Sequence, residues 1–450
     1  MSRPRTIRDP LWGNVRLDAD AASILDSAEF QRLRGVKQLG FAHFVYPGAV
    51  HTRFLHALGV YHLVTRAVDA LAHEGSLNRM DGDARAAVPL VRLAALLHDV
   101  GHYAFSHAME EVGPRSSPGH HEEAAARFLE APAIRRVLED HAPDAVAWIG
   151  ELIRGESRHP LQGLVAGSLD LDKIDYLRRD SLFCGVPYGA VDVDRLMDAI
   201  TLAREEEGAP LEVAVTEKGL SALETLLISK YQMFRNVYWH HAVRAATVTF
   251  RRFIETAVSS GIIERAELAD PTDEELLALV AHRIERTAPD GSHDPASAIG
   301  RTAALLEALT HRRLPKRVIE LTGDSLPDRV SSWTSDRPDL VTRLEDRLAG
   351  EWGLGPGEVT IDHPSQPGML EINLLLVRRD STVQRLTARG ARGILDIPRL
   401  GRSLYHSARV FRVFAAAPVP RRDPGPLLEL IEATPDDVQG RLDDPEPILP

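Results

Sequence analysis

The chain has 450 residues, a formal net charge of −12 at pH 7 and a hydrophobic fraction of 44%. This length is enough for two or three domains with a large core. The acidic balance argues against nucleic acid or an anionic membrane as the main partner. A single cysteine, Cys184, excludes an internal disulfide and a cysteine zinc cluster. Because the sequence has no apolar signal region and no long apolar run, we expect a cytoplasmic protein without a membrane partner.

The first part of the chain is predicted to be helical after a short extended arm. The arm covers residues 6–17, with a turn expected at Gly13 and Asn14. Apolar residues recur at close to helical spacing over 21–40 and again over 52–72, and residues 41–50 between them are expected to form a loop. In the second helix His56 shares a stripe with Leu63, so it points inward. A buried histidine is more often hydrogen-bonded than metal-bound, and both interpretations stay open here.

The central segment, residues 91–107, reads VRLAALLHDVGHYAFSH. An apolar helix runs into His98 and Asp99, and Gly101 can end it because glycine tolerates the left-handed conformation. The two side chains lie roughly 100° apart on a helix, but they can converge on one metal ion where the helix ends. The alternative is a hydrogen-bonded cap. The pair supplies half a coordination sphere, so further ligands must come from elsewhere.

Two later segments offer more polar groups. A loop over 113–119 could cover a site, and His121 follows it at the start of a helix over 124–130. Over 167–180, Asp172 and Tyr176 lie on one side of a helix with Lys173 beside them, which suits a phosphate next to a metal. An exposed charged helix would have a similar pattern.

The remaining segments predict the fold class, a mostly α protein with a small C-terminal α+β appendage. Helices are expected over 192–202, 219–256, from a capping box at 272–275, and over 297–310, with a linker-like turn at 289–295. Strands are expected at 359–361, 370–377 and 410–415, with a helix at 338–348. The predicted domains are a helical core over 1–320, an α+β region over 321–417 and a Pro-rich acidic tail over 418–450 that is partly disordered.

Four possible metal ligands follow one another along the chain in the order His, His-Asp, Asp: His56, His98, Asp99 and Asp172. This order resembles the HD-domain metal-dependent phosphohydrolases, and within them the deoxynucleoside triphosphate triphosphohydrolases that include the SAM-and-HD-domain dNTPases, here without the SAM domain. The strings that carry the resemblance are FQRLRGVKQLG at 30–40, YPGA at 46–49, RFLHALGV at 53–60, HDVGH at 98–102, FSH at 105–107 and DLDKIDY at 170–176. The resemblance covers roughly residues 5–320 and implies an all-helical HD-domain core.

The resemblance also implies roles for individual residues. The divalent metal, which could be Fe, Mn, Zn, Ni or Mg, would be bound by His56, His98, Asp99 and Asp172. Phosphates would be bound by Arg53, Lys173, Lys230 and Arg235. The reaction centre would be lined by His102, His107 and His121, one of which protonates the leaving oxygen. The sugar 3′-hydroxyl would contact Gln38, Tyr176 and Asp180, and a steric gate against a 2′-hydroxyl would consist of Leu39 and Tyr238. The sequence departs from the family at Phe234, where these dNTPases carry a histidine.

The implied reaction is hydrolysis of a dNTP to deoxynucleoside and inorganic triphosphate. The alternatives are another phosphate ester, such as a nucleoside monophosphate or a cyclic nucleotide, and a nucleotide-sensing HD subunit. Regulated relatives assemble into oligomers, so a homodimer or homotetramer and an activator nucleotide are expected. The activator contacts would be Asp26, Gln31, Arg34, Arg312 and Lys316, for which a solvated helix face and a basic loop are the alternative interpretation.

Overall fold

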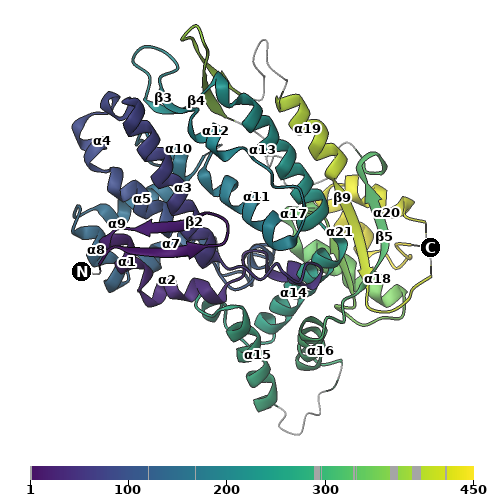
Figure 1. Ribbon diagram of the computed structural model, residues 1–450. Helices are drawn as coiled ribbons and strands as arrows, with labels where there is room; N and C mark the ends of the chain where they lie inside the picture. The colour runs from purple at the N-terminus through teal and green to yellow at the C-terminus, as the bar shows by residue number, and fades with distance from the viewer. Residues whose placement is uncertain are drawn as a thin grey trace.

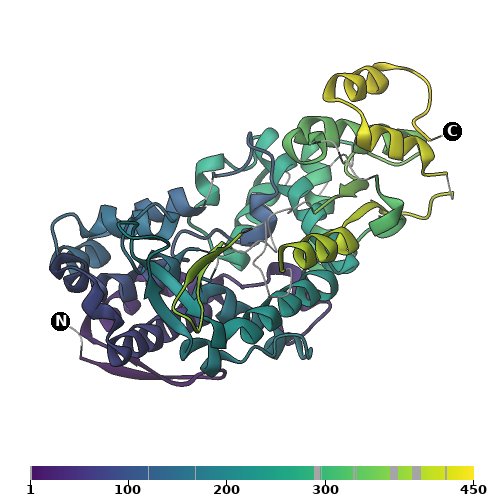
Figure 2. The same cartoon turned by 90° about the horizontal axis from the view of Figure 1, so that it is seen from above.

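The computed structural model describes residues 3–119, 121–167, 169–287, 294, 296–327, 330, 332–364, 373–387, 397–420 and 423–449. Helices make up most of this part of the chain, with three small sheets. Figures 1 and 2 show a helical body with the N-terminus at one end and a region of mixed helices and strands with the C-terminus at the other. The predicted fold class is therefore confirmed. Among the described helices, none combines the length and the apolar character needed to cross a bilayer.

The chain opens with a hairpin of two antiparallel strands, β1 (Arg5–Asp9) and β2 (Gly13–Leu17). Its turn lies at residues 10–12, because the Asp9 carboxylate accepts hydrogen bonds from the backbone N–H groups of Leu11 and Trp12, both at 2.8 Å. Gly13 already pairs with Asp9 in the register of the hairpin. The turn predicted at Gly13 and Asn14 therefore begins earlier than expected.

The main core surrounds α3 (Arg53–Glu74), the long helix predicted over 52–72. It packs against α5 (Val88–Leu97) and α11 (Leu171–Cys184), and its apolar stripe is fully buried at Leu58 and Leu63. Shorter helices complete the body: α1 (Ala19–Leu25), α2 (Ala28–Arg32), α4 (Gly82–Ala86), α6 (Ser106–Glu110), α7 (His121–Leu129), α8 (Pro132–Glu139), α9 (Ala145–Arg154) and α10 (Gln162–Val165).

The single helix predicted over 21–40 is wrong. Ser27 Oγ accepts the backbone N–H of Phe30 at 3.3 Å and starts a new helix, so α1 and α2 are separate. The chain then forms short 3-10 helices at Leu33–Gly35 and Gly40–Phe44, the second of which lies in the predicted loop.

The middle of the chain contains two further corrections. The helix predicted over 192–202 is α12 (Val193–Met197) followed by strand β3 (Ile200–Ala203), which pairs antiparallel with β4 (Glu212–Thr216). The long helix predicted over 219–256 is two helices, α13 (Leu220–Met233) and α14 (His241–Ser259), joined by a π-helical turn at Phe234–Tyr238.

A pair of helices, α15 (Asp273–Thr287) and α16 (Ala298–Thr310), extends from the body at the bottom of Figure 1. At the predicted capping box, the Glu275 carboxylate accepts hydrogen bonds from the backbone N–H and the hydroxyl of Thr272, both at 2.9 Å. The turn predicted at 289–295 lies outside the described residues, apart from residue 294.

The C-terminal region contains an antiparallel sheet of three strands, in the order β5 (Lys316–Thr322), β9 (Val410–Ala415) and β6 (Val359–Asp362). Helix α18 (Pro338–Glu351) packs against β6. The strands predicted at 359–361 and 410–415 and the helix predicted at 338–348 are confirmed. Helices α17 (Trp333–Asp336) and α19 (Ile397–Ala408) lie in the same region.

A second sheet combines the two parts of the chain. Strands β7 (Leu374–Val377) and β8 (Val383–Leu386) extend the β3-β4 pair in the order β3-β4-β7-β8, with β4 and β7 parallel. The start of the strand predicted at 370–377 lies outside the described residues up to 372. The sheet crosses the domain boundary that we predict near residue 320.

The tail over 418–450, for which we predict partial disorder, is largely helical in the part that the structure describes, residues 418–420 and 423–449. It forms α20 (Gly425–Glu432) and α21 (Pro435–Asp443), of which α21 packs against α18. Leu427, Ile431 and Val438 are buried in the core of the C-terminal region. The apolar residues recur at helical spacing, so the tail folds into helices that bury them although its overall composition is polar.

Candidate metal centre and active site

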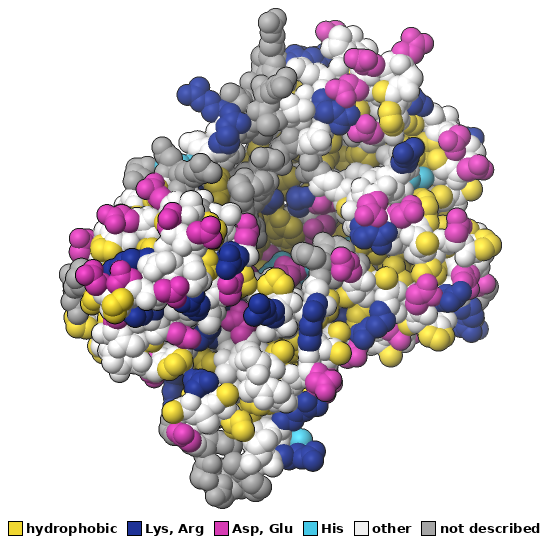
Figure 3. All heavy atoms as spheres, turned by 180° about the vertical axis from the view of Figure 1, so that it is seen from behind, with side chains coloured by type: hydrophobic (Ala, Val, Ile, Leu, Met, Phe, Trp, Pro, Cys, Tyr) yellow, Lys and Arg dark blue, Asp and Glu magenta, His cyan; other side chains and the backbone are white. Residues whose placement is uncertain are grey.

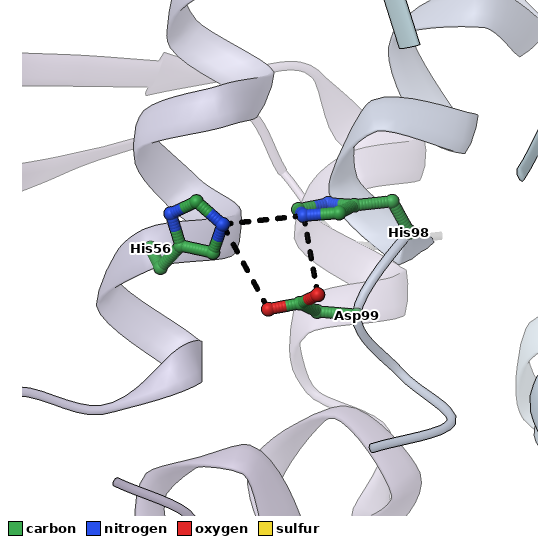
Figure 4. Close-up of side chains that lie close together, drawn as sticks. All are labelled: His56, His98 and Asp99. Atoms are coloured by element: carbon green, nitrogen blue, oxygen red, sulfur yellow. Dashed lines mark hydrogen bonds and ion pairs between the residues drawn. The ribbon is translucent and has the colours of Figure 1, made fainter. Parts of the chain in front are cut away.

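Four side chains with metal-binding groups converge where α3, α5 and α11 meet. His56 lies in the first turn of α3, His98 is the C-cap residue of α5, and Asp99 follows it. Nε2 of His56 lies 3.3 Å from Nε2 of His98 and 3.8 Å from Oδ2 of Asp99. Figure 4 shows these three side chains pointing toward one another. From α11, Oδ1 of Asp172 lies 2.7 Å from Nε2 of His56 and 3.7 Å from Nε2 of His98.

A buried carboxylate behind His56 orients its ring. Oδ2 of Asp175 accepts a hydrogen bond from Nδ1 of His56 at 2.8 Å, so that Nε2 faces the other ligands. Helices α3 and α11 come this close because residue 59 is glycine: a Cβ there would lie 1.9 Å from Oδ1 of Asp175. A carboxylate in this position is the usual support of a metal-binding imidazole.

The support extends to the N-terminal hairpin. Arg179 donates to both oxygens of Asp175, at 2.8 and 2.9 Å, and to Asp9 at 2.9 Å. The indole N–H of Trp12 also donates to Asp175. Arg179 and both carboxylates are at most 1% exposed. The hairpin therefore covers this side of the site, and the buried charges there are paired with one another.

The electrostatics of the four groups favour a cation. Burial alone would lower the pKa of His56, but its hydrogen bonds to Asp172 and Asp175 raise it to about 10. Burial would raise the pKa of Asp172, but the contacts with His56 and His98 hold it below its usual range. The carboxylates are therefore ionised at neutral pH, and a divalent cation can replace the proton on His56. Two imidazole nitrogens and two carboxylates suit Fe, Mn, Zn, Ni or Mg.

Arg53 lies beside this cluster and has a donor group left over. Nη1 donates to Oδ2 of Asp99 at 2.8 Å, and Nε donates to Oγ of Ser106 at 2.9 Å. The residue is 2% exposed, and Nη2 has no hydrogen-bond partner in the described part of the chain. A buried unpaired donor is unfavourable, so an anionic group of a ligand is the expected acceptor.

A second cluster contains the predicted reaction-centre histidines and Glu110. His121 Nδ1 lies 2.7 Å from Oε1 of Glu110, and the His121 ring stacks on the His102 ring with centroids 3.8 Å apart. His102 Nε2 lies 3.0 Å from Oδ1 of Asp99, which links the two clusters. The His107 side chain is 67% exposed, so it lies at the rim.

Both clusters face one cavity of about 760 Å³. Seen from behind, the surface is hollowed in the middle of the face, with charged and histidine side chains inside the hollow (Figure 3). The predicted sugar contacts and gate residues all line the cavity: Gln38, Leu39, Tyr176, Asp180 and Tyr238. The Tyr238 hydroxyl donates to Oδ2 of Asp180 at 2.6 Å.

The comparisons with known proteins agree with this geometry. The HD domain matches residues 53–180 and the HD-associated region matches residues 191–390. The uncharacterized protein MJ1154 of Methanocaldococcus jannaschii is 30% identical over 385 residues, which are 85% of this chain and 74% of that protein. The chain belongs to the HD-domain phosphohydrolases. Among the solved structures, a hypothetical protein from Aquifex aeolicus has a TM-score of 0.65 at 26% identity, with 95% of this chain and 99% of that chain covered.

Relatives with a stated activity are more distant. The deoxynucleoside triphosphate triphosphohydrolase SAMHD1 homolog of Dictyostelium discoideum is 30% identical over 248 residues, and human SAMHD1 is 27% identical over 268 residues. These alignments cover 52% of this chain in each case, and 46% and 42% of the relatives. The similarity to SAMHD1 therefore covers about half of either protein.

Three predicted phosphate-binding residues of this HD-domain phosphohydrolase do not line the described cavity: Lys173, Lys230 and Arg235. Nζ of Lys173 donates to Asp170 at 2.6 Å, and Arg235 is exposed and donates to the hydroxyl of Tyr231 at 2.8 Å. Burial and then the charge of Lys173 lower the pKa of Lys230 to about 8.

The predicted activator contacts fall into two groups. Asp26 pairs with Arg5 at 2.6 Å, and Gln31 accepts from Nε of Arg34 at 2.7 Å. Arg312 and Lys316 line a separate cavity of about 260 Å³ together with His241 and Arg317. Within the described residues, no hydrogen bond or ion pair joins the first three residues to the last two.

Several residues that organise the site were not assigned from the sequence. Asp175 lies within the family string at 170–176, and its spacing of three from Asp172 is the one signal that places both on a shared helix face. Glu110, three residues after His107, offered a similar signal. Ser106 and Asp9 gave none, because their contacts depend on residues distant in the sequence.

Proposed function

We propose that this protein hydrolyses deoxynucleoside triphosphates to deoxynucleoside and inorganic triphosphate. The observation that carries the proposal is a cavity that joins the candidate metal cluster to buried groups with no hydrogen-bond partner among the described residues. Besides Nη2 of Arg53, these are Oε1 of Gln38 and Nδ1 of His102, both in residues no more than 5% exposed. The stated activity of the SAMHD1 relatives supports the same substrate class.

The metal would be held by His56, His98, Asp99 and Asp172, and it would supply an activated water and polarise a phosphoryl oxygen. Arg53 is placed to donate through Nη2 to a phosphate oxygen beside the cluster, where negative charge develops on the α-phosphoryl group.

Water then attacks the α-phosphorus and the bond from phosphorus to the 5′ oxygen breaks, so the leaving oxygen needs a proton. Of His102 and His121, His121 is the better proton donor. Its Nδ1 is held by Glu110. Burial would raise the pKa of Glu110, but the hydrogen bonds with His107 and His121 hold this pKa well below its usual range. By contrast, burial and then Arg53 hold the pKa of His102 well below its ordinary value, so His102 is neutral. With Nε2 directed at Asp99, His102 can accept a hydrogen bond through Nδ1.

In the same cavity, the Tyr238 hydroxyl donates to Asp180, and Leu39 lines the wall as well. This arrangement supports a deoxyribose with its 3′-hydroxyl near Gln38 and Asp180 and with little room for a 2′-hydroxyl. A monophosphate, a cyclic nucleotide or a sensing role remains the competing hypothesis.

The test is turnover by metal-reconstituted protein of each dNTP, with the products separated by ion exchange. In oxygen-18 water the label is expected in the triphosphate and not in the deoxynucleoside. His98→Ala and Asp99→Ala are the controls that lose the metal. If protein with bound metal turns over no dNTP, the proposal fails, and monophosphates and cyclic nucleotides are assayed next.

We also propose activation by a nucleotide and assembly into a homodimer or homotetramer. The basic cavity at Arg312 and Lys316, with Arg317 beside them, supports an anionic ligand. Molecular mass and dNTP turnover measured with and without GTP test this. An unchanged mass and an unchanged rate would contradict it.

A further inference from the structure

The HD-associated region places one buried carboxylate against two segments of the catalytic cavity. Asp273 is the first residue of α15 and is 0% exposed. Its Oδ1 accepts the backbone N–H of Phe105 at 2.8 Å, and its Oδ2 accepts the backbone N–H of Lys37 at 3.0 Å. Both carboxylate oxygens thus accept hydrogen bonds from backbone N–H groups that are far away in the sequence.

The first of these contacts fixes an unusual backbone conformation. Phe105 has φ 52° and ψ 27°, in the left-handed region that non-glycine residues rarely adopt. This conformation is strained for a residue with a side chain, so surrounding contacts must hold it. The Phe105 ring stacks on Phe41 with centroids 4.5 Å apart, and the hydrogen bond to Asp273 fixes its N–H.

The conformation of Phe105 determines where Ser106 lies. Ser106 Oγ accepts the hydrogen bond from Nε of Arg53 and itself donates to the carbonyl of Tyr103 at 2.9 Å. The direction of the Arg53 guanidinium, and hence of its unpaired Nη2, therefore depends on the segment that Asp273 fixes. The second contact has a parallel effect, because Lys37 directly precedes the cavity residues Gln38 and Leu39.

We infer that Asp273 is a positioning residue for catalysis: it holds the backbone at Phe105 and Lys37 so that Arg53 and Gln38 face the substrate. This gives the HD-associated region, which matches residues 191–390, a direct part in shaping the site of the HD domain. The effect on turnover rests on the proposed dNTP hydrolysis. The effect on the backbone does not.

The experiment compares Asp273→Ala with Glu275→Ala. Glu275 lies in the same first turn of α15 and also accepts a backbone N–H, but within the described residues its hydrogen bonds are confined to Thr272. Loss of either carboxylate weakens the start of the helix, but of the two only Asp273 is hydrogen-bonded to Phe105 and Lys37 in the described part of the chain. We expect Asp273→Ala to speed amide hydrogen exchange at Phe105 and Lys37 at least tenfold. We also expect it to lower kcat roughly 10- to 100-fold with unchanged metal content. Glu275→Ala should change neither more than about twofold.

Unchanged exchange at both amides in Asp273→Ala would overturn the inference, and so would equal effects of Glu275→Ala. If wild-type protein hydrolyses no dNTP, the proposed function fails while the exchange comparison still decides the role of Asp273. If Asp273→Ala does not fold, Asp273→Asn keeps the size and one acceptor oxygen. One of the two amides should then lose protection, and full protection of both would overturn the inference.

Discussion

From the hydrogen bond between Asp175 and His56 we predict how much metal affinity falls when the carboxylate is removed. In Asp175→Asn the side-chain volume is kept, but the carboxylate that orients His56 through Nδ1 at 2.8 Å is lost. Removal of such a supporting carboxylate typically weakens metal binding by about 10- to 100-fold, or roughly 1.4–2.7 kcal/mol. The change also leaves Arg179 with only Asp9 as a buried ionised partner in the described network, which costs about 3–5 kcal/mol of folding stability.

The two effects can be separated with a matched control. Asp362 on β6 is an equally buried carboxylate, 1% exposed, that accepts from Arg244 and Arg412. Asp362→Asn should lower the free energy of unfolding by a similar amount and leave the metal affinity unchanged. Affinity is measured by competition with a chelator whose affinity is known, and stability by urea unfolding in excess chelator. A metal affinity of folded Asp175→Asn within twofold of wild type would refute the role that we assign to Asp175.

Three further predictions concern the reaction and its pH dependence. Glu110→Gln should lower kcat by about 10²–10⁴ with the bound metal retained, because His121 loses the carboxylate that holds it; unchanged turnover by the metal-loaded variant would exclude this role. The pKa of His56 is raised to about 10 from an unfolded value near 6.5, so its contribution to the stability of metal-free protein is complete below about pH 6.5 and declines as the pH rises toward 10. Urea unfolding in chelator from pH 6 to 9 should show this decline, and stability that increases with pH would contradict it. The pKa of Lys230 is lowered to about 8 by burial and then by Lys173, so if Lys230 binds a phosphate, KM for dNTP should increase above pH 8 in wild type and not in Lys230→Arg. Identical pH profiles for the two proteins would remove Lys230 from the phosphate-binding set.

The elements that the sequence predicted well are those with a regular pattern over several turns or a complete strand. Helix α3 and strand β9 belong to this group, since one face of α3 and all of β9 are buried. The failures have local physical causes. Ser27 begins a second helix inside an apolar pattern that continues across the break. In β3, four buried residues give no periodicity that separates a strand from a buried helix.

For the site, the side chains of the candidate metal centre were recognisable because the His-Asp pair and its partners occur in strings of fixed spacing. The predicted sugar contacts, among them Tyr238 and Asp180, line the same cavity as His98 and Asp99. The supporting residues were not predictable in this way. Asp273 contacts Phe105 and Lys37 only because α15 packs back onto the core, and nothing in the local sequence around residue 273 encodes that contact.

The sheet β3-β4-β7-β8 has a consequence for synthesis on the ribosome. Strand β4 ends at Thr216, but its parallel neighbour β7 begins only at Leu374. At 5–20 residues per second, β4 waits roughly 10–30 s with one edge unpaired. An unpaired edge is a template for other chains. Nascent chains stalled or truncated between these two strands should therefore aggregate or recruit chaperones, and the protein should express as a complete chain far better than as its helical core alone.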